Sequence, residues 1–361
     1  MNTSTRRSVR FALPFLALML LGQGCLGTTT TAPTGPDGGV WKTADRGVTW
    51  ANKRALVTGP KVTADAANLS IVTMAFDPED SSAIYLGTVA DGIVYSLDAG
   101  DSWQKAKTLN TGRVDAIAVD PKNKCTVYAT MANKIYKTET CGRDWGQIFF
   151  DPRTDKSFTQ IVIDWFNPTN LYAGTSDGDI FKSVDSGVSW QTSTRVDGTP
   201  ISSILMDPRD SRVVYAGTQG AGIYLTVDGG VTWTQIKKQF GDAFSDARRV
   251  TQLVLDPKAP DVLYLVSKYG IIKTSDKGET WSALNLTAPP GTITINAMAV
   301  DPTDSKKLVY VSPTTITYSA DGGMSWTSKK LPTTRQGMAL LIDPKNGGII
   351  YLGTQPQKAQ Q

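Results

Sequence analysis

An eight-residue motif that recurs along the chain constrains the fold more than any other feature. It reads hydroxyl, any residue, Asp, any residue, Gly, any two residues, Trp. Its seven copies occupy residues 43–50, 96–103, 138–145, 183–190, 226–233, 274–281 and 319–326. Successive Trp residues of the motif are 42–53 residues apart. A period of about 40–50 residues is typical of one four-stranded blade of a β-propeller. The motif therefore predicts seven blades.

The residue types of the motif suit a tight turn. The Asp can accept hydrogen bonds from turn amides, the Gly can take a positive φ, the hydroxyl can cap a strand and the Trp can pack. Six copies carry the acid, as Asp45, Asp98, Asp185, Asp228, Asp276 and Asp321, and the third has Thr140 instead. These acids could also form a chemical site. Because seven copies on seven blades cannot all be catalytic, we interpret the motif as structural.

Two more landmarks divide each repeat into strands. An apolar segment ends in Asp-Pro at residues 77–78, 120–121, 207–208, 256–257, 301–302 and 343–344, and each of these except the last precedes a motif copy. The third repeat varies this as Asn167-Pro168, which makes Trp165 and Phe166 an apparent insertion in the turn. A strand centred on a Tyr follows each of these turns, with Tyr85, Tyr128, Tyr172, Tyr215, Tyr264, Tyr310 and Tyr351. Each repeat thus predicts an inner apolar strand A, a Tyr strand B, a strand C that ends at the motif, and a strand D after its Trp.

The two ends of the chain complete each other. The first motif copy has no Asp-Pro or Tyr strand before it, and the last Asp-Pro and Tyr strand, within 336–354, have no motif after them. We expect residues 38–52 to supply strands C and D of the blade that 336–354 begins. The predicted fold is all-β, a single seven-bladed propeller of four-stranded blades over residues 38–354, with a disordered tail at 355–361. Such closure removes exposed sheet edges.

The N-terminus indicates export. Three Arg residues precede an apolar run at residues 11–21, which is too short for a bilayer span of about 20 residues but suits a secretory signal. Residues 21–25 resemble a bacterial lipobox, although Gly22 stands where Leu is usual, so 1–24 is predicted to be a lipoprotein signal and Cys25 the lipidated residue. The alternative is plain secretion without lipid. Residues 25–37 predict a flexible tether that holds the propeller at the membrane of the bacterial cell envelope.

Charge and composition exclude several functions. The chain has a net charge of +4, and the segment after residue 24 is nearly neutral, so no basic field argues for nucleic acid. The sequence has no His, which excludes Ser-His-Asp and Cys-His catalysis and removes the commonest metal ligand. We therefore expect no cofactor and no metal.

Two cysteines lie opposite each other in the second predicted blade. Cys125 begins its strand B and Cys141 lies in its motif, at equal distances from the hairpin tip near residues 131–133. This pairing predicts a disulfide, which an exported protein can keep, in the one blade whose motif has lost its Asp. The alternative is two reduced core residues.

The motif Ser-x-Asp-x-Gly-x-x-Trp resembles the Asp-box, or BNR, repeat. The resemblance covers residues 38–354 and extends to exported propellers, among them photosystem II assembly-factor-like proteins, sortilin-type propellers and xyloglucanase-type glycoside hydrolases. The repeat is specific for fold and uninformative about function. A lipoprotein signal with one propeller is most similar to the assembly-factor-like group, which implies non-enzymatic binding of a membrane or envelope protein.

Variable loops indicate where a partner would bind. The interval from motif Trp to the next Asp-Pro is 17 residues at its shortest and is extended after Trp50, Trp145 and Trp233. These D–A loops lie on the face opposite the motif, and long loops often carry binding sites. Aromatic and basic residues, which protein interfaces favour, occur there as Phe149, Phe150, Arg153, Lys237, Lys238, Phe240, Phe244, Arg248 and Arg249. They would also suit a glycan, and the aromatic residues could instead pin the loops to the blades.

A glycoside hydrolase or glycan-binding propeller is the alternative function. It requires two carboxylates about 5–10 Å apart, and the candidates are Asp91, Asp115, Asp177 and Asp246. Residues 88–92 resemble the xyloglucanase-type acid placement, with two inserted residues and one missing Gly. A sialidase is disfavoured because no Arg-Ile-Pro-type segment lies near the start.

Overall fold

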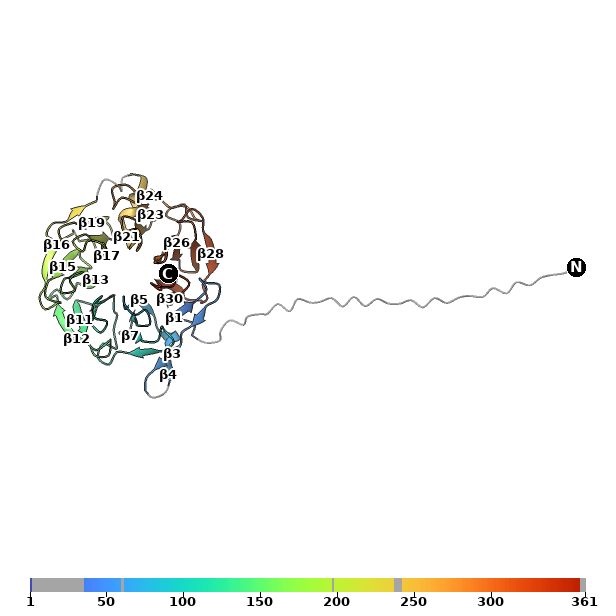
Figure 1. Ribbon diagram of the computed structural model, residues 1–361, viewed down its shortest axis with the longest axis horizontal. Helices are drawn as coiled ribbons and strands as arrows, with labels where there is room; N and C mark the ends of the chain where they lie inside the picture. The colour runs from blue at the N-terminus through green and yellow to red at the C-terminus, as the bar shows by residue number, and fades with distance from the viewer. Residues whose placement is uncertain (2–35, 60–61, 197, 237–241, 358–361) are drawn as a thin grey trace. The chain divides into compact units, whose positions relative to one another are not determined.

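A computed structural model describes residues 36–59, 62–196, 198–236 and 242–357, together with Met1. The predicted signal peptide, Cys25 and most of the tether lie outside the described residues. Within the described part, seven sheets stand around a central axis, as Figure 1 shows. The all-β, seven-bladed propeller predicted from the motif is therefore confirmed. No helix in these ranges is long and apolar enough to cross a membrane.

Each blade contains four antiparallel strands in the order A-B-C-D from the axis outward, and the first blade carries two further strands at its outer edge. The innermost strands, A, are β5 (Ile71–Phe76), β9 (Ala116–Val119), β13 (Phe158–Ile163), β17 (Ile201–Met206), β21 (Val250–Leu255), β25 (Ala297–Asp301) and β29 (Gln336–Ile342). Strands B are β6 (Ile84–Thr88), β10 (Val127–Met131), β14 (Leu171–Thr175), β18 (Val214–Thr218), β22 (Leu263–Ser267), β26 (Asp304–Val311) and β30 (Ile350–Gln355). The A strands of neighbouring blades contact one another around the whole ring.

The outer two strands of each blade flank the repeated motif. Strands C are β7 (Ile93–Ser96), β11 (Lys134–Thr138), β15 (Asp179–Ser183), β19 (Ile223–Thr226), β23 (Gly270–Thr274), β27 (Thr315–Ser319) and β1 (Val40–Thr43). Strands D are β8 (Trp103–Lys105), β12 (Gly146–Phe150), β16 (Gln191–Arg195), β20 (Thr234–Gln235), β24 (Ser282–Ala283), β28 (Thr327–Lys330) and β2 (Ala51–Asn52). The motif and the A–B turns share one face, which we call the turn face. The B–C turns and D–A connections form the opposite, loop face.

The motif forms the same turn in each blade, illustrated by residues 226–233. The hydroxyl of Thr226 donates to the carboxylate of Asp228 at 2.7 Å and accepts the amide of Gly230 at 2.8 Å. The carboxylate in turn accepts the amide of Thr232 at 2.9 Å. Gly229 and Gly230 have φ of 72° and 85°. A Cβ on Gly230 would lie 3.0 Å from a ring carbon of Tyr172 in the preceding blade, so space as well as φ requires glycine here.

This turn also joins neighbouring blades. The main-chain carbonyl of Gly229 accepts hydrogen bonds from the Tyr172 hydroxyl and the Lys182 ammonium of the preceding blade, both at 2.7 Å. The ammonium also lies 5.5 Å from the centre of the Tyr172 ring. Burial raises the pKa of Tyr172 to about 12, which keeps its hydroxyl protonated as a donor. The seven Tyr residues predicted to mark strand B are all buried and line the contacts between blades.

The ring closes as the two chain ends predict. Strand β1 pairs with β30 from Val40↔Gly353 to Thr43↔Ile350, so the seventh blade combines β29 and β30 with β1 and β2. The guanidinium of Arg46 reaches the buried carboxylate of Asp301 in blade six at 2.6 Å. The main-chain carbonyl of Asp37 accepts the Trp41 indole and the Thr333 hydroxyl. The ring is therefore closed by the pairing of β1 with β30, by the ion pair of Arg46 and by the hydrogen bonds to Asp37.

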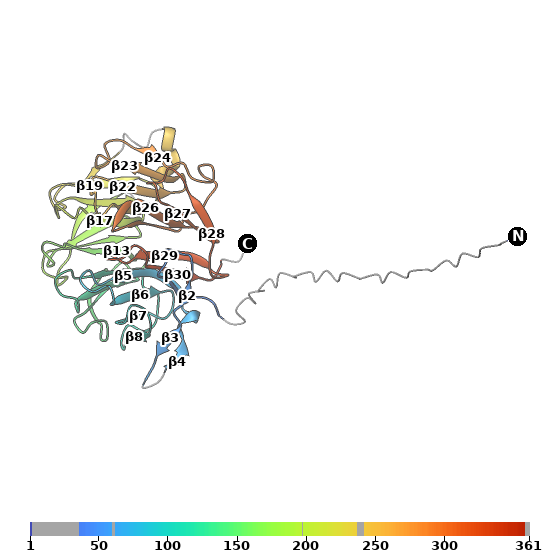
Figure 2. The same cartoon turned by 45° about the vertical axis from the view of Figure 1, so that its right-hand side comes forward.

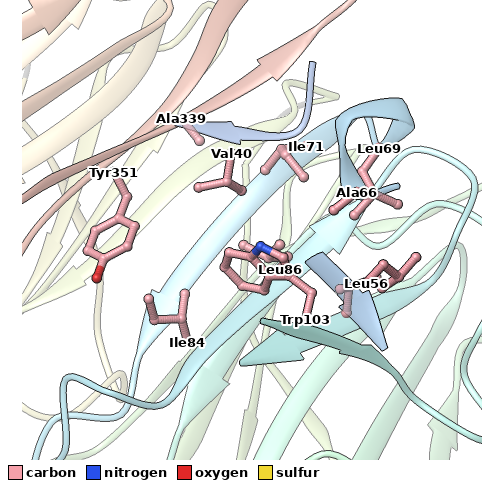
Figure 3. Packing of buried hydrophobic residues seen from close by; sticks show 11 residues of the cluster. Val40, Leu56, Ala66, Leu69, Ile71, Ile84, Leu86, Trp103, Ala339 and Tyr351 are labelled. Carbon is pink, nitrogen blue, oxygen red and sulfur yellow. The ribbon is translucent and has the colours of Figure 1, made fainter. Parts of the chain in front are cut away.

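The long connection after Trp50 is not a simple loop. It forms a hairpin of β3 (Ala55–Val57) and β4 (Val62–Asp65) followed by the short helix η1 (Ala66–Asn68). Strand β3 pairs in parallel with β8, so blade one has six strands rather than the predicted four (Figure 2). Leu56 packs beside Trp103, which is fully buried and donates its indole N–H to the carbonyl of Lys53 at 3.0 Å (Figure 3). The extra residues here stabilise the join between the last and first blades.

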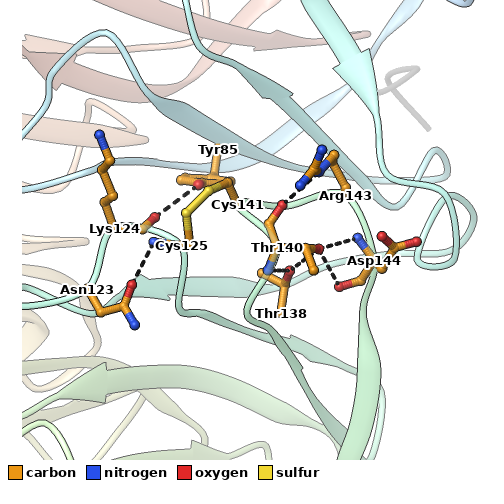
Figure 4. Close-up of a disulfide and its surroundings, with 9 residues drawn as sticks. All are labelled: Tyr85, Asn123, Lys124, Cys125, Thr138, Thr140, Cys141, Arg143 and Asp144. Carbon is orange, nitrogen blue, oxygen red and sulfur yellow. Dashed lines mark hydrogen bonds between the residues drawn. A yellow bond between two sulfur atoms is a disulfide. The ribbon is translucent and has the colours of Figure 1, made fainter.

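The predicted disulfide between Cys125 and Cys141 is confirmed (Figure 4). It ties the start of strand B to the motif of blade two, where Thr140 replaces the usual Asp. The hydroxyl of Thr140 accepts the amide of Asp144 at 2.9 Å, so a hydroxyl covers part of the lost contacts. The seventh motif position is Ser or Thr in the other six copies and Asp144 here. The acid and the hydroxyl have thus exchanged places in this blade.

One predicted variation in the third blade is wrong. Asp164 accepts the amides of Phe166 and Asn167 at 2.8 and 3.0 Å, and its own amide donates to the carbonyl of Asn170, the same contacts that Asp77 makes in its Asp-Pro turn. Asp164 rather than Asn167 is therefore the turn acid, Trp165 takes the place of Pro, and no insertion exists. The interval of eight residues from this acid to the strand-B Tyr, which five of the other six repeats share, could have identified Asp164 from the sequence.

We expect Arg46→Gln to lower the free energy of unfolding by about 2–4 kcal/mol, because it leaves a buried carboxylate without its cation. The matched control is Lys53→Gln, which removes the more exposed Lys53–Asp101 pair and should cost less than about 1 kcal/mol. Urea unfolding followed by Trp fluorescence measures both. Equal effects of the two substitutions would contradict the importance of the buried pair for closure.

The motif acids predict a decline in stability at low pH. Hydrogen bonds, chiefly from the motif hydroxyls, lower the pKa of Asp185, Asp276 and Asp321 from 3.8 to about 2. A lowered folded-state pKa stabilises the fold above pH about 4, and this contribution is lost as pH falls towards 2. We expect the urea midpoint to fall over this range, and the difference between wild type and Asp276→Asn to shrink with it. A difference that is constant from pH 7 to pH 2 would contradict this prediction.

Candidate functional site

The loop face was predicted to carry the binding surface, and several of its predicted aromatic residues pack against the blades. The ring of Phe149 lies 5.9–6.2 Å from those of Phe158, Phe181 and Trp190. Phe244 packs against Tyr269 at 5.3 Å. Both Phe149 and Phe150 belong to strand β12 rather than to a loop, and only Phe150 is exposed. Phe149 and Phe244 therefore fix the positions of their segments.

Arg153 is part of an ion-pair network. Its guanidinium contacts the carboxylates of Asp151, Asp177 and Asp179 at 2.5, 3.0 and 2.9 Å, and these carboxylates, chiefly Asp151, raise its pKa. Arg195 approaches Asp179 from the other side at 3.5 Å. The same network includes Asp177, one of the predicted catalytic candidates. Its charges are largely paired within the protein, so Arg153 does not present a free cation to a partner.

The remaining carboxylate candidates are held separately. Asp91 pairs with Lys105 at 2.6 Å, and Asp115 pairs with Arg113 at 2.6 Å. Burial raises the pKa of Asp115 despite its cation. Asp91 forms a bridge with Gly112, so it lies beside the segment that leads to Asp115, whereas Asp177 and Asp246 belong to other blades. Among the described residues, no three metal-ligating side chains gather in a way that could hold a metal ion.

The structure describes only some of the aromatic and basic residues predicted after Trp233. Lys237, Lys238 and Phe240 lie outside the described residues. Arg248 and Arg249 are exposed at the end of η3 (Asp242–Arg248), as is Asp246. Arg249 forms a bridge with Gln219 in the B–C turn of blade four, and the carbonyl of Arg248 accepts the amide of Gly222. These contacts place the two Arg residues over the junction of blades four and five.

A pocket of about 650 Å³ opens beside Arg249 on the loop face. Three neighbouring blades contribute its walls: Gln219 and Gly220; Arg249, Val250 and Thr251; Ser267 and Lys268; and the D–A segment 291–295. We call it the cationic pocket, because Arg249 and Lys268 are its charged residues and no Asp or Glu is among the lining residues described. Among the side chains that the structure describes, no carboxylate forms an ion pair with either cation.

Sequence reasoning found Arg249 and missed the rest of this pocket. Lys268 stands in a short B–C turn, and residues 291–295 end a connection only slightly longer than the minimum. Lys268 and residues 291–295 come together because blade six packs next to blade five. The spacing of motifs in the sequence does not show this contact. The 20-residue interval after Trp281, against a minimum of 17, was the only available signal.

Comparison with known proteins supports the architecture. A family model described as sortilin, neurotensin receptor 3 (Sortilin-Vps10) matches residues 221–334, about a third of the chain. The chain is an Asp-box β-propeller. No curated protein sequence matches it.

Solved structures share this fold at low sequence identity. The GH74 xyloglucanase from Xanthomonas campestris has a TM-score of 0.63 at 17% identity, and the match covers 80% of this chain and 51% of that one. The GH74 enzyme from Niastella koreensis has a TM-score of 0.65 at 17% identity, with the same coverage of both chains. A structure titled "YCF48 bound to D1 peptide" has a TM-score of 0.61 at 16% identity, covering 81% of this chain and 94% of that one. The propeller therefore spans about half the length of the GH74 enzymes.

We expect Arg153→Gln to act on stability. The substitution leaves the largely buried carboxylates of Asp151 and Asp179 without their main cation, which should cost about 1–3 kcal/mol after allowance for the partial exposure of the Arg. Arg212→Gln is the control, since it removes only the exposed pair with Asp210, which water screens, and should leave the stability nearly unchanged. Thermal unfolding measures both. Loss of partner binding without loss of stability in Arg153→Gln would instead restore Arg153 to the binding surface.

Proposed function

We propose that this Asp-box propeller is an exported, non-enzymatic binding module, tethered by a lipidated N-terminus to the bacterial envelope. It takes an acidic segment of a partner protein into the cationic pocket on its loop face. The observation that carries the proposal is the pocket itself, with two cations, several hydroxyl and amide side chains and no carboxylate among the lining residues described. A carboxylate of a partner would supply the missing counter-charge.

The chemistry of the pocket suits this ligand. Arg presents a planar set of donors that matches a carboxylate, and charge-assisted hydrogen bonds are stronger than neutral ones. Gln219, Thr251 and Thr292 add groups that can both donate and accept, as a peptide main chain requires. Since both cations are exposed, the attraction should be screened by salt and should mainly affect association.

The comparisons support a protein ligand. In the solved structure YCF48 is bound to a D1 peptide, and the match with this chain covers 94% of that one. The family-model match at residues 221–334 includes Arg249, Lys268 and the segment 291–295. The predicted signal and tether would place the loop-face pocket near envelope proteins.

A glycoside hydrolase is the second candidate. The observation that favours it is Asp115, whose pKa is raised by burial, beside the segment that also holds Asp91. A raised carboxyl pKa suits a general acid. Release of reducing sugar from xyloglucan by the wild type, but not by Asp115→Asn, would favour this candidate over a binding module.

We expect wild-type protein to bind fluorescein-labelled Gly/Ser decapeptides that carry Glu, and to bind the matched Gln peptides at least tenfold more weakly. Arg249→Gln should reduce the Glu peptide's affinity about tenfold, because a charge-assisted contact is worth about 1.5–3 kcal/mol. Arg248→Gln is the matched control, since this neighbouring exposed cation does not line the pocket. Fluorescence polarisation at low and physiological salt measures each. Binding that does not distinguish Glu from Gln peptides, or Arg249→Gln from Arg248→Gln, would refute the proposal.

A further inference from the structure

A second pocket adjoins the cationic pocket along the same loop. It has a volume of about 520 Å³, and its walls include Tyr269, Ile271, Leu284, Leu286, Pro289 and Pro290. No charged residue is among its described lining residues, so we call it the apolar pocket. Pockets with aromatic, aliphatic and proline walls accept apolar side chains.

The two pockets share their dividing wall. The B–C turn of blade five contributes Ser267 and Lys268 to the cationic pocket and Tyr269 and Gly270 to the apolar pocket. The D–A connection likewise lines the apolar pocket up to Pro290 and the cationic pocket from Gly291. The amide of Gly291 donates to the carbonyl of Tyr269 at 3.1 Å, which fastens these two segments together between the pockets.

The dividing wall is held from both sides. Tyr269 packs edge to face against Phe244, with ring centres 5.3 Å apart. In the connection, the carbonyl of Pro289 accepts the amide and the hydroxyl of Thr292 at 3.2 and 2.7 Å. Because these contacts and the two prolines restrict the wall, the separation of the pockets is set by the fold rather than by the ligand.

We infer that the apolar pocket is a second subsite for the same partner, which takes a bulky aliphatic or aromatic side chain a short distance from the acidic group. The inference rests on the proposed function, since the cationic pocket supplies the first contact. An extended peptide advances about 3.3 Å per residue, so neighbouring pockets of this size suit side chains about two to four residues apart. The ligand class is therefore an extended peptide that carries one apolar anchor and one carboxylate.

The polar walls favour a peptide over an anionic lipid. Beside the cations, Gln219, Thr251, Ser267 and Thr292 offer both donors and acceptors. A peptide main chain uses both, whereas a phosphate headgroup uses donors only. Asn285 and Thr287 line the apolar pocket as well and can bond the main chain that carries an inserted side chain.

The test uses substitutions on one edge strand. Ala283 and Ser282 are adjacent and exposed in β24, but only Ala283 lines the apolar pocket. Ala283→Trp should fill the pocket, and Ser282→Trp is the matched control for the added bulk and for folding. The probes are fluorescein-labelled Gly/Ser decapeptides with one Leu and one Glu, two, three or four residues apart, and versions with Leu→Ser or Glu→Gln. Fluorescence polarisation gives their affinities for the full chain.

We expect at least one Leu/Glu spacing to bind about tenfold more tightly than its Leu-to-Ser version. Ala283→Trp should abolish that advantage and leave the affinity of the Leu-free Glu peptide unchanged, and Ser282→Trp should keep both. If Glu and Arg249 matter but Leu never does, or if the two Trp variants behave alike, this inference is wrong and the proposed function stands. If neither Glu nor Arg249 matters, the proposed function fails. Binding to phosphatidylglycerol vesicles that needs Arg249 and an open apolar pocket, without peptide binding, would overturn both in favour of a lipid site.

Discussion

Packing between the buried side chains of neighbouring blades is the interaction on which the ring depends, and at three blade contacts a Tyr hydroxyl of the preceding blade also donates to a motif carbonyl. The Tyr172 hydroxyl and the Lys182 ammonium converge on the carbonyl of Gly229. Tyr128 and Tyr351 make the same contact with Ser186 and Ala99 in their neighbouring blades. That carbonyl points to its donors because residues four and five of the motif adopt positive φ. One turn therefore both shapes a blade and aligns it with its neighbour.

The turn face and the loop face of the propeller therefore differ in what their residues do. Residues on the turn face are occupied by the repeat, with acids that accept amides and lysines that bond carbonyls. Only one blade modifies the pattern substantially, and there a disulfide and an exchanged acid and hydroxyl stabilise the turn. The connections of the loop face do not carry the motif, so their length and sequence can vary from blade to blade. One variation became a hairpin that covers Trp103, and others form the adjoining cationic and apolar pockets.

The fold was largely predictable from the sequence, because each landmark records a local requirement that recurs seven times. The binding surface was less predictable from the sequence than the fold. The predicted set mixed Phe149, which packs against a core cluster, with Arg153, which pairs with three carboxylates, and Arg249, which lines a pocket. All three residues were predicted on the same grounds, which were an aromatic or basic side chain and a long connection. What separates them is the set of neighbours, and those neighbours come from other strands and other blades.

The sequence by itself determined the number of blades, the closure of the ring by its two ends and the disulfide, because hairpin register and repeat period are local properties of the chain. Tertiary structure alone decided which loop-face charges remain unpaired and which segments meet. Arg153 and Arg249 differ in no sequence property that matters here. One lies beside Asp151 and Asp179, and the other lies beside Lys268 and residues 291–295 of a neighbouring connection. Long-range packing of blades four, five and six creates that difference.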